Sequence, residues 1–204
     1  MRLADVPQPQ SAAAEAALEV VTAYSSTAMV HHCRRSYVWA AAYAAEHGMD
    51  VDHELLWVSA MLHDIGLMPA FDNHAVPFEH AGGHVAWVFG AGAGWSIHRR
   101  ERAAEVIVRH MWDAVDPDED PEGFLLEIAT GLDISGRNPQ WWSPSLRVEV
   151  VKAFPRLGLA PEFTACFRAE AARKPDSSAA LALTRGIAER LAANILDSDP
   201  AREP

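Results

Sequence analysis

The sequence predicts an all-α protein that folds as a single helical bundle, and three observations support this. Apolar residues recur at the 3.6-residue period of an amphipathic helix along most of the chain, and no alternating strand pattern extends beyond a few residues. A length of 204 residues suits one domain with a sizeable core. No internal repeat or linker-like segment divides the chain, so we expect one helical domain at 10–197 between flexible tails at 1–9 and 198–204.

The helices of the first half of the chain are bounded by residues that cap or end helices. Gly48 is a typical stop for the second helix, and Asp50 or Asp52 is placed to cap the third. A loop with two prolines at 67–78 precedes the fourth helix, and three glycines within 90–94 end it. We expect helices at residues 10–21 and 27–46, a third ending near Ile65, and two more at 79–89 and 96–111.

The second half of the chain continues the helical pattern after an acidic turn at 113–121. A loop at 135–144 carries the neighbouring residues Trp141 and Trp142, which would either cover a functional pocket or pack the loop onto the bundle. Helices are expected at residues 124–134, 145–154, 161–173 and 178–196.

Composition narrows the classes of partner. The net charge is −11 and only two lysines occur, which disfavours nucleic acids and anionic membranes, because both attract clustered cations. No run of about 18 apolar residues suggests a membrane span, and the first residues lack the apolar core of a signal peptide. Cys33 and Cys166 are too few for a disulfide framework or a Cys-rich zinc site. These features predict a reduced, soluble, cytoplasmic protein, and they leave a homo-oligomer open.

The most informative motif is the dipeptide His63-Asp64, because imidazole and carboxylate are both ligands of divalent metals. Adjacent helix positions differ by about 100°, so the two side chains can converge on one ion beside the helix. The flanking residues are apolar and would bury both polar groups at a cost that a metal offsets. An upstream His32 and a downstream Asp133 extend the pattern.

His32 begins a helical face with the composition expected of a buried site wall. The i, i+3, i+4, i+7, i+11 spacing places one histidine and one arginine beside small and aromatic residues on this face. Its members are His32, Arg35, Ser36, Trp39 and Tyr43. The alternative is that His32 is a hydrogen-bonded core histidine, and the His-Asp dipeptide downstream favours the metal ligand.

The order His, then His-Asp, then Asp resembles the HD-domain superfamily of metal-dependent hydrolases, with matches at His32, His63-Asp64 and Asp133. The resemblance covers residues 25–140 and is closest in motif pattern to the branch that contains cyanamide hydratase. The motifs similar to that branch are His32-Cys33-Arg34-Arg35-Ser36-Tyr37, Phe78-Glu79-His80-Ala81-Gly82-Gly83 and Ile107-Val108-Arg109-His110. The resemblance implies an HD-like helical bundle whose metal is held by His32, His63, Asp64 and Asp133.

The number of metals depends on histidines between the His-Asp pair and the final aspartate. Some superfamily members add two histidines there and hold two metals, and His80 or His84 together with His110 would supply them. In the branch that this chain most resembles, Glu79 occupies the position of such a histidine, so one divalent ion is favoured. Zinc is the favoured ion, with iron or manganese as alternatives. The roles of His74, His80 and His84 remain open.

The implied reaction is attack of a metal-activated water on a small-molecule substrate, since a divalent ion lowers the pKa of water from about 15.7 toward about 7. His110 and Glu79 are the candidates for moving protons or orienting the substrate. Arg35 and Arg137 are the candidates for contacting it. The resemblance favours a nitrile or another C–N substrate and therefore a hydrolase or hydratase.

Three alternatives remain open from the sequence. A phosphohydrolase acting on a nucleotide would need several cations around the metal, and Arg35, Arg109 and Arg137 are the plausible set. A di-iron oxygenase would need the second metal. A non-catalytic ligand-binding protein would use the same pocket without turnover.

Overall fold

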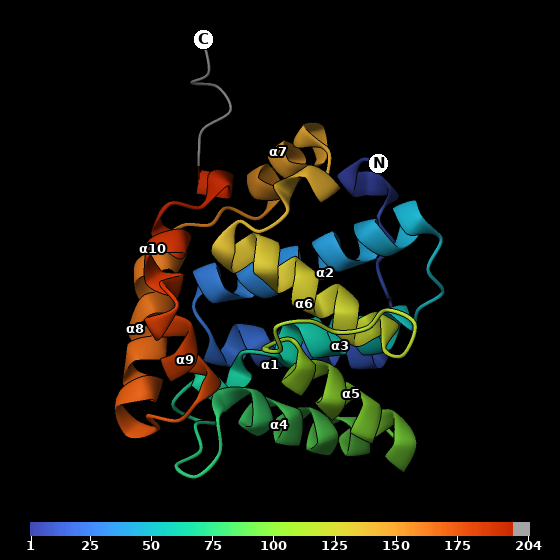
Figure 1. The fold of residues 1–204 in the computed structure, drawn as a ribbon. Helices are drawn as coiled ribbons and strands as arrows, with labels where there is room; N and C mark the ends of the chain where they lie inside the picture. The colour runs from blue at the N-terminus through green and yellow to red at the C-terminus, as the bar shows by residue number, and fades with distance from the viewer. Residues whose placement is uncertain (198–204) are drawn as a thin grey trace.

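The centre of the fold is the pair α2 (Thr27–His47) and α6 (Pro121–Ser135), which pack against each other although they lie far apart in the sequence (Figure 1). The structure is a computed structural model that describes residues 1–197, and the tail predicted at 198–204 lies outside the described residues. All regular structure in 1–197 is helical, which confirms the predicted all-α class.

Two further helix pairs extend the bundle on one side of this centre. Helix α1 (Ala12–Tyr24) packs on α3 (His53–Leu62), and α4 (Phe78–Gly92) packs on α5 (Ile97–Arg109). The remaining helices are α7 (Pro144–Ala153), α8 (Leu159–Arg173), α9 (Ser178–Thr184) and α10 (Ile187–Ala192). Helices α8, α9 and α10 stand upright along one side of the bundle, across the direction of the other pairs (Figure 1). Short 3-10 turns lie at Leu3–Asp5, Ile65–Leu67, Pro139–Trp141 and Ile195–Asp197.

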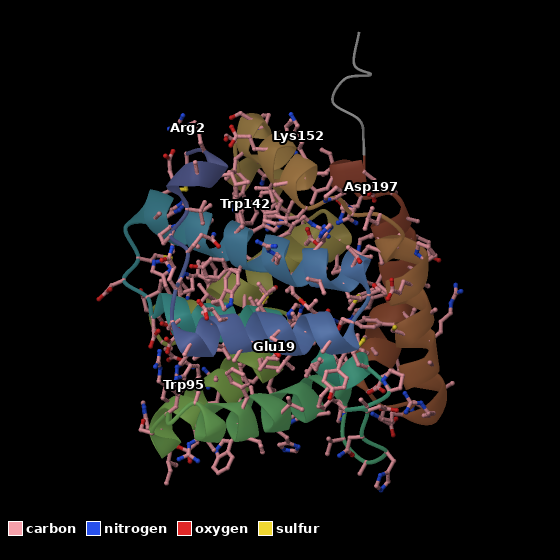
Figure 2. All side chains as sticks on the ribbon, turned by 180° about the vertical axis from the view of Figure 1, so that it is seen from behind. Arg2, Glu19, Trp95, Trp142, Lys152 and Asp197 are labelled. Atoms are coloured by element: carbon pink, nitrogen blue, oxygen red, sulfur yellow. The ribbon has the colours of Figure 1, made fainter. Side chains whose placement is uncertain are left out.

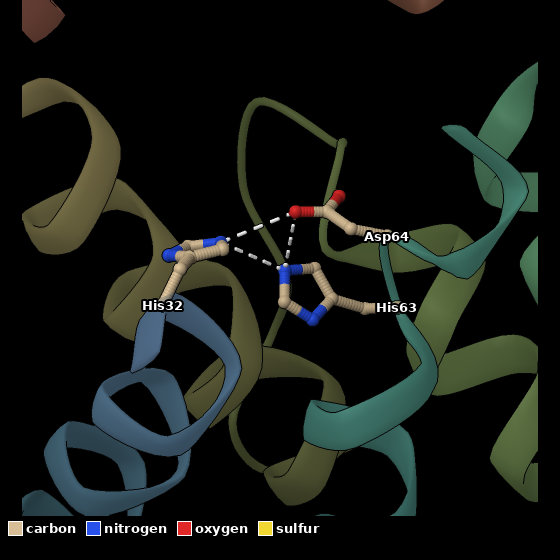
Figure 3. Close-up of side chains that lie close together, drawn as sticks. All are labelled: His32, His63 and Asp64. Carbon is tan, nitrogen blue, oxygen red and sulfur yellow. Dashed lines mark hydrogen bonds and ion pairs between the residues drawn. The ribbon is translucent and has the colours of Figure 1, made fainter. Parts of the chain in front are cut away.

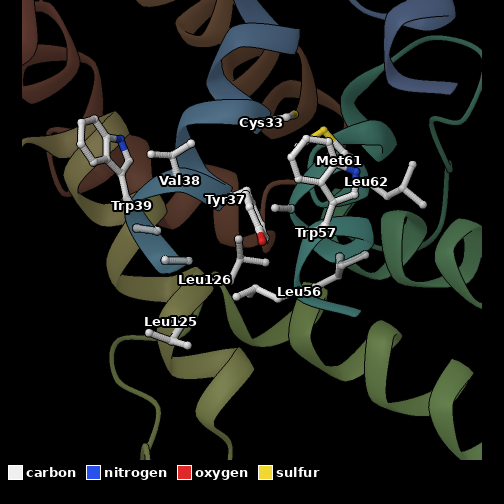
Figure 4. Packing of buried hydrophobic residues seen from close by; sticks show 14 of the residues in the cluster. Cys33, Tyr37, Val38, Trp39, Leu56, Trp57, Met61, Leu62, Leu125 and Leu126 are labelled. Carbon is white, nitrogen blue, oxygen red and sulfur yellow. The ribbon is translucent and has the colours of Figure 1, made fainter. Parts of the chain in front are cut away.

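The core lies between α2, α3 and α6 and combines bulky side chains with small ones (Figure 4). Tyr37 of α2 meets Trp57 of α3 edge to face, with ring centroids 4.8 Å apart. Leu126 of α6 is fully buried in the same cluster. Burial of these apolar groups is the main favourable contribution to packing the three helices together, and it fixes which side of α2 faces the interior.

Capping side chains set where the helices begin. Asp52 accepts a hydrogen bond from the Leu55 backbone N–H at 2.9 Å, so it is the cap of the two aspartates considered, and Gly48 ends α2 as predicted. Asp120 accepts from the Gly123 N–H at 2.7 Å, and Pro121 takes the first helical position. Helix α6 therefore starts earlier than the predicted residue 124.

The tryptophans in the loop before α7 pack the loop onto the bundle rather than covering a pocket. Trp142 is 1% exposed and donates its indole N–H to the Trp39 carbonyl at 2.9 Å. Figure 2 shows Trp142 inside the molecule between α2 and α7, while Lys152 and Glu19 point outward.

Two segments depart from the prediction. The helix expected at 178–196 is broken into α9, α10 and a 3-10 turn, and Gly186 between the two helices has a φ of 77°, a conformation that favours glycine. The segment expected to be a loose tail at 1–9 is packed on the bundle. Val6 is buried, and the Tyr37 hydroxyl donates to the Pro7 carbonyl at 2.7 Å.

No helix within 1–197 is both long and apolar enough to cross a membrane.

Candidate metal centre

Helix α2 and the end of α3 bring His32, His63 and Asp64 together inside the bundle (Figure 3). His32 lies in the second turn of α2, His63 caps the C-terminus of α3, and Asp64 begins the turn that follows. All three side chains are buried. Gly66 lets this turn pass close to α4, since a Cβ at that position would overlap the Phe78 carbonyl oxygen.

One atom of each side chain points at a common place. The Nε2 atoms of His32 and His63 lie 3.0 Å apart. Oδ2 of Asp64 lies 3.2 Å from the His32 Nε2 and 3.1 Å from the His63 Nε2. Figure 3 shows the three atoms as a small triangle. A divalent ion bound by such side chains needs ligand atoms that converge in this way.

The hydrogen bonds around the triangle show why a cation fits it. The His32 Nδ1 lies 2.7 Å from Asp133 Oδ2, and the His63 Nδ1 lies 2.8 Å from the Ala60 carbonyl oxygen. Both partners are acceptors, so each neutral ring carries its proton on Nδ1 and turns a lone pair on Nε2 toward the triangle. Neither carboxylate oxygen of Asp64 has a hydrogen-bond partner in the described part of the chain. Three lone pairs therefore face one another, and a divalent ion would neutralise them.

The carboxylates around the triangle are charged at neutral pH. Burial alone would raise the pKa of Asp64, but the neighbouring His63 and His32 rings hold it well below its usual value. Burial alone would also raise the pKa of Asp133, but the guanidinium of Arg35 holds the pKa of that carboxyl far below the usual range. Desolvation would lower the pKa of His32, but the hydrogen bond to Asp133 and the nearby Asp64 carboxylate raise it. Because Arg35 neutralises Asp133, Asp64 is the negative charge that faces the triangle and suits it to a cation.

Asp133 lies behind the His32 ring, at its Nδ1 edge, and not at the triangle formed by His32, His63 and Asp64. Its Oδ2 accepts from the His32 ring and from Arg35 Nη2 at 2.8 Å. Its Oδ1 accepts from Arg35 Nε at 2.8 Å and from the Trp39 indole at 3.1 Å. Asp133 was predicted to be a metal ligand. In this structure its oxygens are used by donors on the far edge of the His32 ring, where they fix the orientation of the imidazole.

Arg35, predicted to contact a substrate, does not line the cavity beside the metal centre. Its guanidinium is 0% exposed and is held by Asp133 and by the carbonyls of Phe154 and Pro155 at 2.8 and 3.3 Å. The i+3 spacing from His32 placed Arg35 correctly on one face of α2, but the face is covered by α6. Arg35 therefore neutralises Asp133 where no substrate reaches it.

A cavity of about 390 Å³ opens beside the triangle. His32, His63 and Asp64 form one part of its wall, and Phe163 and Phe167 of α8 form another. Further lining comes from the C-terminal end of α5 and from α6, α9 and α10. The cavity is large enough for a small organic molecule next to a metal ion.

His110 follows α5 and borders both the cavity and the triangle. Its Nε2 lies 3.9 Å from Asp64 Oδ1, and its ring centroid lies 4.9 Å from that of His63. Its Nδ1 bonds to the Ile107 carbonyl, so the proton sits on Nδ1 and Nε2 is a free acceptor. Burial, reinforced by the neighbouring His63, lowers the pKa of His110 to about 3, and the ring is neutral at neutral pH.

The remaining residues predicted to take part in the site, Glu79 and Arg137, differ in burial and in whether they line the cavity. Glu79 of α4 is buried, does not line the cavity, and accepts a hydrogen bond from the Ser178 hydroxyl at 2.8 Å. Arg137 lies exposed at the cavity, with its guanidinium bonded to Glu127. Ser178 lines the cavity, yet no motif marks it, because a lone serine at the start of a helix has no sequence pattern of its own.

The three histidines whose roles the sequence left open are all exposed. His80 and His84 line a separate surface hollow with Arg109 and Trp112, and His74 lies in the loop before α4. Among the described residues, His32, His63 and Asp64 are the one group whose ligand atoms lie close enough together to hold a metal.

The arrangement is consistent with comparisons to known proteins. Residues 29–129, about half of the chain, match the family model of the HD domain. Two proteins of Saccharomyces cerevisiae, cyanamide hydratase DDI2 and cyanamide hydratase DDI3, are each 28% identical to this chain over 179 residues. Each alignment covers 83% of this chain and 77% of the relative. The HD match contains the triangle and His110, and it ends before Asp133.

Proposed function

We propose that this chain, which belongs to the HD domain family, is a metal-dependent enzyme that adds water to a small C–N substrate such as cyanamide or another nitrile. The observation that carries the proposal is the triangle of lone pairs on His32, His63 and Asp64 at the wall of a cavity. The similarity to two cyanamide hydratases supports the choice of substrate class. His32, His63 and Asp64 would hold one divalent ion, with zinc favoured and Asp133 orienting His32 from behind.

The residues around the triangle suit hydration of a nitrile. A divalent ion bound there lowers the pKa of a water molecule and polarises the substrate. The free Nε2 of His110 would relay a proton from the attacking water to the substrate nitrogen, and the ring, which its lowered pKa keeps neutral at rest, would be neutral again after the relay. The net change adds one oxygen to the carbon and two hydrogens to the nitrogen, and it yields an amide. Phe163 and Phe167 give the cavity an apolar part of its wall.

Phosphate-ester hydrolysis is the second candidate, because arginines line the rim of the cavity. Of the three arginines expected to serve a phosphate, Arg137 alone lines it. Arg35 is held by Asp133, and Arg109 is paired with Asp120 at 2.7 Å away from the cavity. Arg185 also lines the rim and pairs with Asp113 at 2.6 Å. Arg190 lines the cavity as well and bonds to the Arg185 carbonyl rather than to a carboxylate. Because Arg137 and Arg185 already have anionic partners, the lining favours a neutral substrate.

The di-iron alternative has less support. A second ion needs its own set of converging ligands, and the described residues offer a single such group. His80 and His84, which would complete a second site, face solvent on the outer side of α4.

Metal analysis followed by a substrate screen tests the proposal. We expect about one zinc ion per chain and conversion of cyanamide to urea. Asp64→Ala should lose both the ion and the activity, while the matched control Asp50→Ala, at an exposed aspartate, should keep both. Two irons per chain would instead support an oxygenase, and turnover of nucleotides without turnover of cyanamide would support a phosphohydrolase. A metal-free wild type prepared without chelators would contradict the metal site.

A further inference from the structure

Ser178 is the one polar residue of α9 that connects the cavity to a buried carboxylate. It is the first residue of α9 and lines the cavity together with His63, Asp64 and His110. Its hydroxyl donates a hydrogen bond to Glu79 Oε2 at 2.8 Å. Ser178 therefore lies between the cavity, where a substrate would bind, and the Glu79 carboxylate, which does not line the cavity.

The carboxylate form of Glu79 gives this hydrogen bond its direction. Burial raises the pKa of Glu79 above its usual value, and the hydrogen bond from the Ser178 hydroxyl opposes that rise. Glu79 lies in the first turn of α4 and is 5% exposed. A carboxylate accepts hydrogen bonds and donates none, so the proton between the two groups belongs to Ser178. The favourable end of the helix dipole supports a negative charge at this place in α4. Such charge-assisted bonds are stronger than bonds between neutral groups.

A serine hydroxyl carries one proton and two lone pairs. With its proton committed to Glu79, the Ser178 oxygen can only accept hydrogen bonds from a molecule in the cavity. The bond to a carboxylate also makes that oxygen a better acceptor. The hydroxyls of Thr130 and Ser135, which line the same cavity, donate to carbonyls of their own helix instead.

We propose that Ser178 is a specificity-determining residue that accepts a hydrogen bond from an N–H of the substrate, with Glu79 as a positioning residue that fixes the direction of the Ser178 hydroxyl. The proposal rests on the hydratase function proposed above and narrows it to substrates with an N–H beside the reacting C–N bond. Cyanamide has such an amino group. Acetonitrile, of nearly the same size, has a methyl group in its place and leaves the Ser178 acceptor without a partner.

The test compares these two substrates in the metal-loaded wild type and in Ser178→Ala. The measured quantity is the ratio of kcat/KM for cyanamide to kcat/KM for acetonitrile, so that the different reactivities of the two molecules cancel between proteins. We expect Ser178→Ala to lower this ratio by about 10- to 100-fold, the effect of losing one hydrogen bond assisted by a charge. If acetonitrile is not turned over, its inhibition constant against cyanamide replaces its kcat/KM.

One structural observation and two control variants separate recognition from folding. Ser177 rather than Ser178 caps α9, with its hydroxyl accepting from the Ala180 N–H at 3.2 Å, so Ser178→Ala keeps the helix start. Ser178→Thr keeps a hydroxyl and should keep the ratio. Ser135→Ala removes another hydroxyl of the same cavity and should leave the ratio unchanged.

Each outcome distinguishes this inference from the function on which it rests. A wild type that hydrates cyanamide, together with an unchanged ratio in Ser178→Ala, would overturn the inference and leave the hydratase standing. A drop in turnover of both substrates by the same factor would assign Ser178 a structural role and would also overturn it. A metal-loaded wild type that hydrates neither substrate would overturn the proposed function and the inference together.

Discussion

At the level of single residues, the candidate site depends on where the protons of three imidazoles lie. His32, His63 and His110 each place Nδ1 against an acceptor of the protein, namely Asp133, the Ala60 carbonyl and the Ile107 carbonyl. All three rings thereby turn an unprotonated Nε2 inward. Two of these atoms converge with Asp64, and the third, on His110, stays apart from them.

His110→Ala tests this division among the histidines. The variant should keep its metal, because His110 is outside the group that converges on one point. It should slow turnover by about 10²- to 10⁴-fold, the usual effect of removing a general acid or base. Metal content by elemental analysis and kcat on the best substrate are the measurements. Loss of the metal would make His110 a ligand, and unchanged turnover would make it a structural histidine.

At the level of elements, the acidic turn before α6 joins two helices of the site. Asp120 caps α6 and pairs with Arg109 of α5 at 2.7 Å and also with Arg102 of α5. Its side chain is 1% exposed although both arginines are partly exposed. Helix α6 carries Asp133 and α5 leads into His110, so this one carboxylate helps to hold both sides of the site in register.

Replacing Asp120 should destabilise the protein in a pH-dependent way. Burial would raise the pKa of Asp120, but Arg102, the Gly123 N–H and Arg109 together hold it below its usual value. A lowered pKa means that the stabilisation is present above the ordinary range of an aspartate and is lost as the pH falls through the folded-state value. Asp120→Asn should lower the free energy of unfolding by about 1–2 kcal/mol near neutral pH.

Urea unfolding of wild type and Asp120→Asn between about pH 7 and about pH 3 provides the measurement. The difference between the two proteins should shrink toward the acid end of this range. A difference that stays constant with pH would mean that the charge of Asp120 contributes nothing. An exposed control, Asp50→Asn, should show no difference at either pH.

At the level of the whole molecule, the triangle joins helices that contact each other mainly through apolar side chains. His32 comes from α2, while His63 and Asp64 come from the end of α3. An ion that binds only the folded arrangement adds its binding free energy to the stability of the bundle.

Removal of the metal should therefore lower the melting temperature. At a metal concentration about 100 times the dissociation constant the contribution is about 2.7 kcal/mol, or roughly 5–10 °C in Tm for a chain of this size. Calorimetry before and after chelation, with re-addition of zinc, measures the shift. Asp64→Ala should show no shift on chelation. Equal Tm values for loaded and stripped wild type would contradict a metal bound by the folded bundle.

The sequence predicted what is encoded locally and missed what is decided by packing between distant segments. Gly48 and the cap at Asp52 act within one helical turn, so the end of α2 could be read directly and the start of α3 could be narrowed to a cap at Asp50 or Asp52. The order of His32 and His63-Asp64 along the chain was enough to predict that these three side chains meet. The burial of Arg35 and the position of Asp133 behind the imidazole could not be read, because they depend on how α6 lies against α2. The contact of Ser178 with Glu79 joins residues from α9 and α4 in the same way.

The walls of the cavity come largely from outside the stretch that matches the HD domain. The match ends at residue 129, whereas Ile134, Phe163, Phe167 and Leu181 all line the cavity and follow it in the chain. The candidate metal ligands and most of the cavity wall thus lie in consecutive parts of one polypeptide. Substitutions after residue 129 can therefore reshape most of the cavity without changing His32, His63 or Asp64.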